Sequence, residues 1–282
     1  MNIPDRTLND GHAIPAIGFG TYPLLGKEGY EAVRSALDTG YRLIDTAVNY
    51  ENEGTVGRAI RDFLRESGVD RSDVTVQTKL PGRHHDTERA IASGYESLQR
   101  LGLDQIDVFL IHWPNPITGK FVEAWRGLVK LRERGVVRSI GVSNFAESHL
   151  GDIIADSGVT PVLNQIELHP LFTQEAMRAV HDRLGIVTES WSPLGKRSAP
   201  FGVGAVARAA NAHGVTPAQV VLRWQVQLGN VPLPKSSNVA RQAANLDVFD
   251  FALGDDEMAA VGALHRSDGR LFGGDPTTHE EM

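Results

Sequence analysis

Eight short apolar runs, each followed by a longer segment with helical spacing, recur along the 282 residues of this chain. Most runs are apolar on both faces, as in Val108-Phe109-Leu110-Ile111, which is typical of parallel strands covered by helices on both sides. Eight strand-then-helix units in ~250 residues are the number and length typical of an α/β fold of the (β/α)8 TIM-barrel type. The runs lie at about residues 16–20, 41–46, 74–80, 106–112, 137–142, 162–168, 186–191 and 231–235.

An open, doubly wound sheet is the alternative, because its local pattern of strands and helices is the same. The count of eight and the absence of a linker or composition break favour the barrel, as a single domain over residues 1–282. An N-terminal hairpin over residues 1–15, built around the turn Asp10-Gly11, is expected to close the bottom of the barrel. The polar, Gly-rich tail of residues 266–282 is expected either to fray or to cover the opposite mouth.

Two of the helix-like segments carry end signals. In 119–135 the apolar residues fall near one stripe, and Gly135 supplies a stop at the C-terminal end. The segment 217–229 opens with Thr216-Pro217, a capping residue followed by proline at the first helical position. Both are predicted to be helices.

Composition excludes several classes of function. A formal net charge of −7 argues against bulk binding to nucleic acid or to a membrane surface, which needs a basic face. The chain has no cysteine, so disulfides, thiolate metal sites and a cysteine nucleophile are excluded. Neither an N-terminal targeting segment nor an apolar run of roughly 18 residues is found. We expect a cytoplasmic monomer without a metal site.

Four polar residues lie at or just past the ends of three of the predicted strands: Asp45, Tyr50, Lys79 and His112. The carboxyl ends of parallel strands in a barrel meet at one mouth, so these side chains are expected to converge there. An acid, a phenol, an ammonium and an imidazole at one point can transfer a proton. This cluster is the candidate catalytic site.

Each of the four also has a purely structural explanation when it is taken alone. Asp45 could cap the next helix, Lys79 could be an exposed lysine at a strand end, and His112 could be a satisfied buried histidine. Tyr50 could be a packing aromatic with its hydroxyl in water. Their joint placement at the face where barrels carry active sites favours the catalytic interpretation.

A second group of residues lies where the eighth strand leads into a helix. Lys235 and Ser236 end the strand, Ser237 and Asn238 open the helix, and Arg241 follows one turn later. A helix N-terminus with two bases can bind phosphate. The alternative is a capped helix whose bases are solvated.

Amides, hydroxyls and an indole close the fifth, sixth and seventh strands. They are supplied by Ser143, Asn144, Gln165, Trp191 and Ser192. Amide groups could hold a carboxamide, and a large indole could stack on a flat ring.

Two local sequences look like motifs but lack their essential features. Gly18-Phe19-Gly20 begins like a dinucleotide fingerprint, yet the third glycine position holds Pro23. His84 and His85 are adjacent and cannot share one face of a helix, so they are interpreted as a polar loop rather than a metal pair.

The chain resembles the aldo-keto reductase family over about residues 5–275, and most of all the bacterial 2,5-diketo-D-gluconate reductase-like branch. The matching stretches are Gly18-Phe19-Gly20-Thr21, Leu43-Ile44-Asp45-Thr46-Ala47 with Tyr50 and Asn52-Glu53, Thr78-Lys79, Ile111-His112-Trp113-Pro114, Ile140-Gly141-Val142-Ser143-Asn144-Phe145, Asn164-Gln165-Ile166-Glu167 and Pro234-Lys235-Ser236.

The resemblance implies a barrel that binds NADPH or NADP⁺ in extended form and reduces small carbonyl compounds, dicarbonyls or keto-sugars to alcohols. It implies that Tyr50 is the general acid and that Lys79, salt-linked to Asp45, lowers the pKa of Tyr50. It implies that His112 orients the carbonyl. The substrate would contact Tyr22, Tyr50, His112 and Trp113.

The resemblance also implies where the cofactor would lie. Ser143, Asn144 and Gln165 would hold the nicotinamide carboxamide, and Trp191 would stack on its ring. Lys235, Ser236 and Arg241 would hold the 2′-phosphate, and Asn245 would face the adenine. The other expected cofactor contacts are Gly20, Thr21, Tyr22, Asp45, Ser192, Leu194, Gly195, Ser237 and Asn238.

Some positions depart from the family pattern. Ala244 stands where the family often has a glutamate that contacts adenine, and Pro81 stands where related reductases carry a tryptophan that forms a pocket wall. The loops at 115–119 and 195–201 are short, so we expect an open, broad pocket. An NADPH-binding redox sensor with little turnover is an alternative. A metal-dependent lyase or hydrolase would need more ligands than His112 and Asp45.

Overall fold

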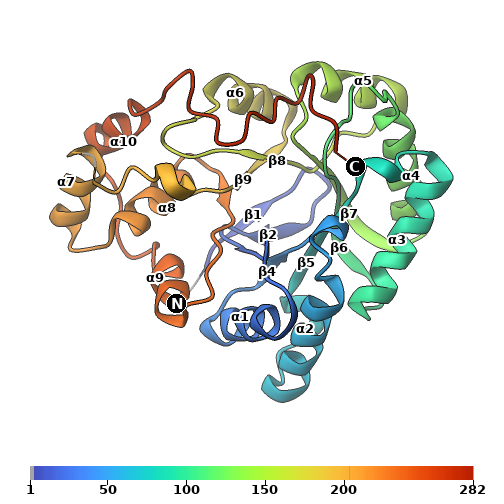
Figure 1. The fold of residues 1–282 in the computed structure, drawn as a ribbon, viewed down its shortest axis with the longest axis horizontal. Helices are drawn as coiled ribbons and strands as arrows, with labels where there is room; N and C mark the ends of the chain where they lie inside the picture. The colour runs from blue at the N-terminus through green and yellow to red at the C-terminus, as the bar shows by residue number, and fades with distance from the viewer. Residues whose placement is uncertain (1–2, 203, 282) are drawn as a thin grey trace.

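The structure, a computed structural model, describes residues 3–202 and 204–281. Eight parallel strands form one sheet whose spatial order follows the sequence, and helices surround it (Figure 1). The strands are β3 (Phe19–Gly20), β4 (Leu43–Asp45), β5 (Thr75–Leu80), β6 (Ile106–Ile111), β7 (Val137–Ser143), β8 (Leu163–Glu167), β9 (Val187–Trp191) and β10 (Val231–Pro232). Each falls on one of the eight predicted runs.

Backbone hydrogen bonds between the first and last strand regions close the sheet. The amide of Gly18 donates to the carbonyl of Pro232 at 3.1 Å, and the amide of Gly20 donates to that of Pro234 at 3.2 Å. An open, doubly wound sheet would leave these two edges apart. The predicted (β/α)8 barrel is therefore confirmed.

The helix Phe121–Glu133 (α4) shows how an apolar stripe packs against the outside of the barrel. In α4, Phe121, Trp125, Leu128 and Leu131 are buried in the main core cluster. The helices over the described residues are α1 (Gly26–Thr39), α2 (Glu53–Ser67), α3 (Thr87–Leu101), α4 (Phe121–Glu133), α5 (Glu147–Ser157), α6 (Glu175–Leu184), α7 (Gly204–His213), α8 (Pro217–Gln227), α9 (Val239–Leu246) and α10 (Asp255–Gly262). None of them combines the length and apolarity that a membrane span requires.

The predicted end signals act as expected. The Thr216 hydroxyl accepts a hydrogen bond from the amide of Gln219, and Pro217 is the first residue of α8. Gly135 follows the end of α4 with a φ of 72°, a left-handed conformation that costs glycine little. Both predicted helices are confirmed: α4 is two residues shorter than predicted at each end, and α8 begins where predicted and ends two residues earlier.

A hairpin closes the N-terminal end of the barrel, as predicted. Strands β1 (Asp5–Thr7) and β2 (Ala13–Pro15) pair antiparallel. Leu8 and Ile14 are buried in the cluster that fills the barrel interior, together with Val108 and Leu110. Residues 1 and 2 lie outside the described residues.

The C-terminal segment returns across the carboxyl ends of the strands, as the dark red chain in Figure 1 shows. The ring of Phe272 lies 5.9 Å from that of Trp191, and the ring of His279 lies 4.2 Å from that of Trp113. Of the two expectations for the tail, the covering arrangement is the one observed for residues 266–281. Residue 282 lies outside the described part. The division of the chain into domains stays a prediction.

Candidate active site

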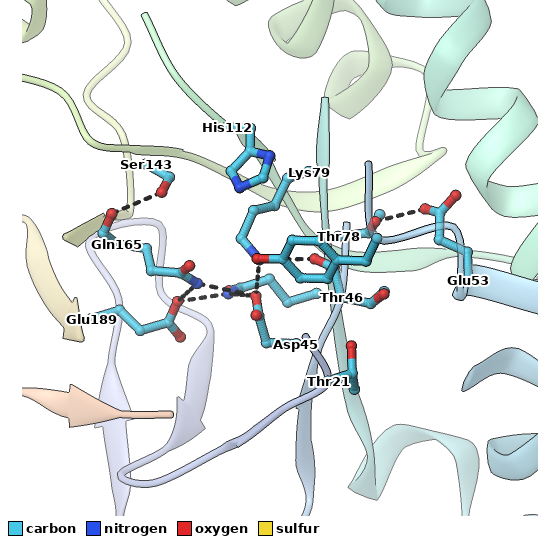
Figure 2. Close-up of polar contacts among 12 residues, drawn as sticks. Thr21, Asp45, Thr46, Glu53, Thr78, Lys79, His112, Ser143, Gln165 and Glu189 are labelled. Atoms are coloured by element: carbon cyan, nitrogen blue, oxygen red, sulfur yellow. Dashed lines mark hydrogen bonds and ion pairs between the residues drawn. The ribbon is translucent and has the colours of Figure 1, made fainter. Parts of the chain in front are cut away.

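Asp45, Lys79 and His112 lie together at the carboxyl end of the barrel (Figure 2), and the fourth predicted catalytic residue, Tyr50, contacts Lys79. Asp45 ends β4, Lys79 lies in β5, His112 follows β6, and Tyr50 ends the short 3-10 turn Val48–Tyr50. The Lys79 ammonium donates to Asp45 Oδ1 at 2.6 Å, to the Thr46 carbonyl at 2.9 Å and to the Tyr50 hydroxyl at 3.3 Å. The rings of Tyr50 and His112 are 5.6 Å apart. The convergence predicted from the strand ends is observed.

Burial and ion pairing act in opposite directions on Lys79. Its side chain is 0% exposed. Burial, the largest single effect, lowers the pKa of Lys79, but the charge of Asp45, the nearby Tyr50 hydroxyl and the hydrogen bond to Asp45 together raise it above its usual 10.5. The residue is therefore a fixed positive charge beside the Tyr50 hydroxyl.

The pKa of Tyr50 departs from the expectation. We expected Lys79 to bring it down toward neutral pH. In the structure, burial raises the pKa of Tyr50 to about 12, and the charge of Lys79 only partly opposes this effect. Although part of the ring is exposed, the hydroxyl is enclosed, and Asp45 and Glu281 add negative charge nearby. Lys79 lowers the pKa of Tyr50, as predicted, but desolvation outweighs this single ammonium, so the net shift is upward.

A layer of buried polar side chains lies under the catalytic cluster, and the sequence analysis missed two of its members. The Gln77 amide donates to Asp45 Oδ1 at 2.9 Å and to Glu189 Oε2 at 2.6 Å. The Gln165 amide makes the same pair of bonds at 3.0 and 2.6 Å. The missed signal was a polar residue at an inward position of β5 and of β9, namely Gln77 and Glu189.

Glu189 is fully buried, and none of the described residues places a cation within bonding distance of it. Burial, followed by the charge of Asp45, raises the pKa of Glu189 to about 8. The two glutamine amides oppose this effect by donating to the carboxylate. Glu189 therefore keeps its proton at neutral pH, and the floor of the site carries one negative charge, on Asp45, rather than two.

The predicted nicotinamide-binding residues form a connected set of hydrogen bonds. The Ser143 hydroxyl donates to the Gln165 carbonyl at 2.8 Å. The Asn144 amide donates to the His112 carbonyl and to Ser143 Oγ, both at 3.0 Å, and the Trp191 indole donates to Asn144 Oδ1 at 2.8 Å. Asn144 has a φ of 61°, in a region that asparagine tolerates better than most residues. This conformation holds its amide next to His112.

A cavity of about 750 Å³ opens above these residues. The residues that line it and were predicted for cofactor or substrate are Gly20, Thr21, Tyr22, Asp45, Tyr50, His112, Trp113, Asn144, Gln165, Trp191, Ser192, Leu194 and Lys235. The lining residues that were not predicted include Lys196, Phe201, Leu233 and Phe272. The short loops were expected to leave the pocket open, but Phe272 of the C-terminal segment supplies part of the wall.

The predicted phosphate-binding residues lie mostly beyond the cavity wall. Lys235 lines the cavity, whereas Ser236, Ser237, Asn238, Arg241 and Asn245 do not. Two residues predicted for other parts of the cofactor, Ser143 and Gly195, do not line it either. Asn238 Oδ1 accepts from the Arg241 amide at 3.0 Å, so this side chain caps α9. Lys235 and Arg241 are exposed and form no ion pair with other described residues. The arrangement agrees equally with a phosphate site and with the capped-helix alternative.

The histidine pair 84–85 does not form the expected polar loop. Both side chains are buried, at 9% and 2% exposure. His84 Nδ1 lies 3.1 Å from Ser93 Oγ, and its Nε2 lies 3.1 Å from an Arg89 nitrogen. Over residues 3–202 and 204–281, no group of three or more His, Asp or Glu side chains is placed to hold a metal ion.

Glu281, in the C-terminal segment, is a further charged group at the catalytic end that the sequence did not indicate. Its Oε1 lies 2.6 Å from Nδ1 of His112, which is an ion-pair distance, although the angle is not that of a hydrogen bond. Nothing in the local sequence indicates that a residue 169 positions after His112 would reach it.

Comparison with known proteins gives a consistent result. A sequence model of the Aldo/keto reductase family matches residues 16–200 and 202–266. The chain is 55% identical to 2,5-diketo-D-gluconic acid reductase B of a Corynebacterium species, with 100% of this chain and 99% of the relative covered. A crystal structure of a Gox0644 mutant in complex with NADPH superposes with a TM-score of 0.93 at 41% identity, covering 99% and 100% of the two chains. A Bombyx mori aldo-keto reductase in complex with NADP gives 0.88 at 35% identity, covering 94% of each.

Proposed function

This chain belongs to the aldo/keto reductase family, and on that premise we propose that it reduces aldehydes and ketones to alcohols with NADPH, using Tyr50 as general acid. The observation that carries the assignment of roles is the contact of one buried ammonium, Lys79, with both Asp45 and Tyr50 at the end of a large cavity. The substrates we propose are small aldehydes, ketones, dicarbonyls and keto-sugars.

Carbonyl reduction builds negative charge on the carbonyl oxygen, so a proton donor must point at that oxygen. With a pKa of about 12, the Tyr50 hydroxyl stays protonated at neutral pH and can donate. After the transfer, the phenolate lies 3.3 Å from the Lys79 ammonium, which stabilises it in a region of low dielectric. Asp45 keeps Lys79 charged and holds it in place.

His112 is the second group we assign to the carbonyl oxygen. It lines the cavity, and its ring lies edge-on to Tyr50 at 5.6 Å. A donor at this place would orient the carbonyl toward the Tyr50 hydroxyl. The aromatic side chains of Tyr22, Trp113 and Trp191 would provide apolar walls that hold many small carbonyl compounds loosely.

The residues around the cavity fit NADPH by their chemistry. A flat indole at Trp191, the amides of Asn144 and Gln165, and the base Lys235 line one continuous cavity. Asn144, Gln165 and Ser143 would hold the carboxamide, although the Gln165 amide nitrogen is already bonded to Asp45 and Glu189. Lys235, Ser236 and Arg241 would hold the 2′-phosphate. NADPH when bound supplies the hydride, and the protein supplies position and electrostatics.

The test is loss of NADPH absorbance at 340 nm with a panel of aldehydes, ketones, dicarbonyls and keto-sugars. We expect turnover with several members of the panel, and a comparison of Tyr50→Phe with wild type assigns the acid. Tight NADPH binding without turnover of any member would instead favour the redox-sensing alternative. That the protein is a cytoplasmic monomer stays a prediction, which light scattering and cell fractionation can test.

A further inference from the structure

The C-terminal segment places a carboxylate on the catalytic histidine. Glu281 Oε1 lies 2.6 Å from His112 Nδ1. The Glu281 side chain is 12% exposed, so most of its hydration has been removed. Removing a charge from water is costly unless other groups replace the lost hydration, so the partners of this carboxylate decide its state.

Those partners come from three different loops of the barrel mouth. The Asn49 amide donates to Glu281 Oε1 at 2.7 Å, and the Gly82 backbone amide donates to Oε2 at 3.2 Å. Asn115 fixes the backbone on both sides, because its amide donates to the Glu281 carbonyl at 2.6 Å and its oxygen accepts from the Glu281 amide at 3.0 Å. Burial would raise the pKa of Glu281, but His112 and these donors together lower it. The carboxylate is therefore ionised at neutral pH.

Three other ionisable groups near this pair, Tyr50, His85 and Glu280, do not compete for it. Tyr50, with a pKa of about 12, is neutral. Burial lowers the pKa of His85 to about 4, so this imidazole carries no charge at neutral pH either. Glu280 points to the other side, where its Oε1 accepts from the Ile117 amide at 2.7 Å. Among the residues that the structure describes, the His112 imidazole is the group at ion-pair distance from Glu281 that can carry a positive charge.

The position of this carboxylate constrains where the protons of His112 lie. A neutral imidazole has one proton, and an ionised acceptor beside Nδ1 draws that proton to Nδ1. Nε2 would then carry only a lone pair, which repels the oxygen of a carbonyl substrate. When both nitrogens are protonated, Nε2–H can donate to the carbonyl oxygen while Glu281 balances the charge at Nδ1. Nδ1 is the nitrogen that the tail covers, which leaves Nε2 for the substrate.

We propose that Glu281 is a positioning residue for the reduction, which the C-terminal segment brings to His112 to hold it as an imidazolium with Nε2–H directed at the substrate carbonyl. This inference rests on the proposed function for its catalytic consequence. The C-terminal segment then has a role beyond covering the cavity, because its docking brings Glu281 to His112, the residue that orients the carbonyl. The role is electrostatic, so it depends on the carboxylate and not on the presence of a side chain of that size.

The test compares Glu281→Gln with Glu280→Gln. Both remove one carboxylate from the same stretch of the tail, but Glu280 bonds to Ile117 and Thr118 of a surface loop and not to His112. In wild type, ¹⁵N NMR of selectively labelled histidine at pH 7 should show both nitrogens of His112 protonated. In Glu281→Gln the signal should change to that of a neutral ring, and in Glu280→Gln it should stay as in wild type.

Turnover should change in Glu281→Gln and stay as in wild type in Glu280→Gln, as the NMR signal does. We expect kcat of Glu281→Gln to fall on the order of tenfold to hundredfold, because a misplaced or uncharged donor no longer orients the carbonyl. The dissociation constant for NADPH should be unchanged, since none of the residues assigned to the cofactor contacts Glu281. Glu281→Asp keeps the charge and should recover part of both the imidazolium signal and kcat.

Several results would overturn the proposal. Equal losses in Glu280→Gln and Glu281→Gln would mean that the tail matters only through its docking. An unchanged or higher kcat in Glu281→Gln would mean that the carboxylate is not needed or obstructs the site, and so would a neutral His112 in wild type. The NMR measurement does not require turnover. If wild type were inactive with every carbonyl but showed the paired imidazolium, the proposed function would be wrong and the ion pair would still be supported.

Discussion

The cationic side chains at the two ends of the cavity differ in their exposure to water and in their partners. At the catalytic end, Lys79 is fully buried and bonded to Asp45, Thr46 and Tyr50 before any ligand arrives. At the other end, Lys235 lines the cavity and Arg241 lies beyond its wall. Both are exposed to water and form no ion pair with the described residues. A charge fixed in a dry environment acts strongly and needs no reorganisation during the reaction. A solvated base gains its partner only when the ligand binds. The first arrangement suits rate acceleration, and the second suits affinity and selection among cofactors.

The largest expected effect tests the catalytic end. Tyr50→Phe removes only the hydroxyl, and Lys79→Met removes the charge that stabilises the phenolate. General acid catalysis contributes about 10²–10⁴-fold, so each variant should lose at least this much kcat while still binding NADPH. Stopped-flow absorbance measures the hydride step, and fluorescence titration measures binding.

The two residues form one hydrogen-bonded unit, so the double variant should be little worse than either single variant. Losses that multiply would show that they act separately. Near-normal turnover by Tyr50→Phe would mean that the proton comes from another group, with His112 the first to examine.

The second prediction concerns the floor of the catalytic end. Glu189 has a pKa of about 8 in the folded protein, above its ordinary 4.5. Between these values the folded protein keeps a proton that the unfolded chain has lost, so stability falls as pH rises from about 5 to 8. The decline is at most about 1.4 kcal/mol per pH unit. Glu189→Gln mimics the protonated acid, so its stability should not show this decline with rising pH.

Urea unfolding of wild type and Glu189→Gln at pH 5, 6.5 and 8 measures this effect. The variant should gain stability relative to wild type as the pH increases. A difference between the two proteins that is independent of pH would show that Glu189 is ionised across the whole range.

The third prediction tests the exposed end. Arg241→Ala should weaken NADPH binding by about 1.5–3 kcal/mol, roughly tenfold to hundredfold in the dissociation constant, by removing a charge-assisted bond to the phosphate. NADH binding and kcat at saturating NADPH should be unchanged. Arg134→Ala, an exposed base at the opposite end of the barrel, is the matched control. If Arg241→Ala weakened NADH and NADPH equally, the 2′-phosphate assignment would be wrong.

The smallest effect is expected at the mouth between the two ends. Phe272 lies over Trp191, and the Lys196 ammonium is 4.2 Å from the Phe272 ring. Phe272→Ala should raise KM a few-fold and shift the substrate profile toward bulkier carbonyls, because it removes one apolar wall. Steady-state kinetics on a graded series of aldehydes would measure this. An identical profile would mean that the C-terminal segment does not contact the substrate.

The sequence by itself was enough to predict the barrel and the convergence of the four candidate catalytic residues. Strand and helix periods are local properties, and parallel strands bring Asp45, Lys79 and His112 to one mouth whatever the details of packing. The hairpin and the capped helices follow from short-range signals such as Asp10-Gly11 and Thr216-Pro217, which act within a few residues of chain.

Only the tertiary structure decided the electrostatics around that cluster. Glu189 meets Asp45 through two glutamines across the barrel, and no local pattern indicates that contact. The height of the Tyr50 pKa depends on how much water the surrounding atoms displace, which is a property of the whole site. Glu281 reaches His112 from the last residues of the chain. Charges interact through space and through the solvent they exclude, so their effects depend on distances and burial that are set only when the chain has folded.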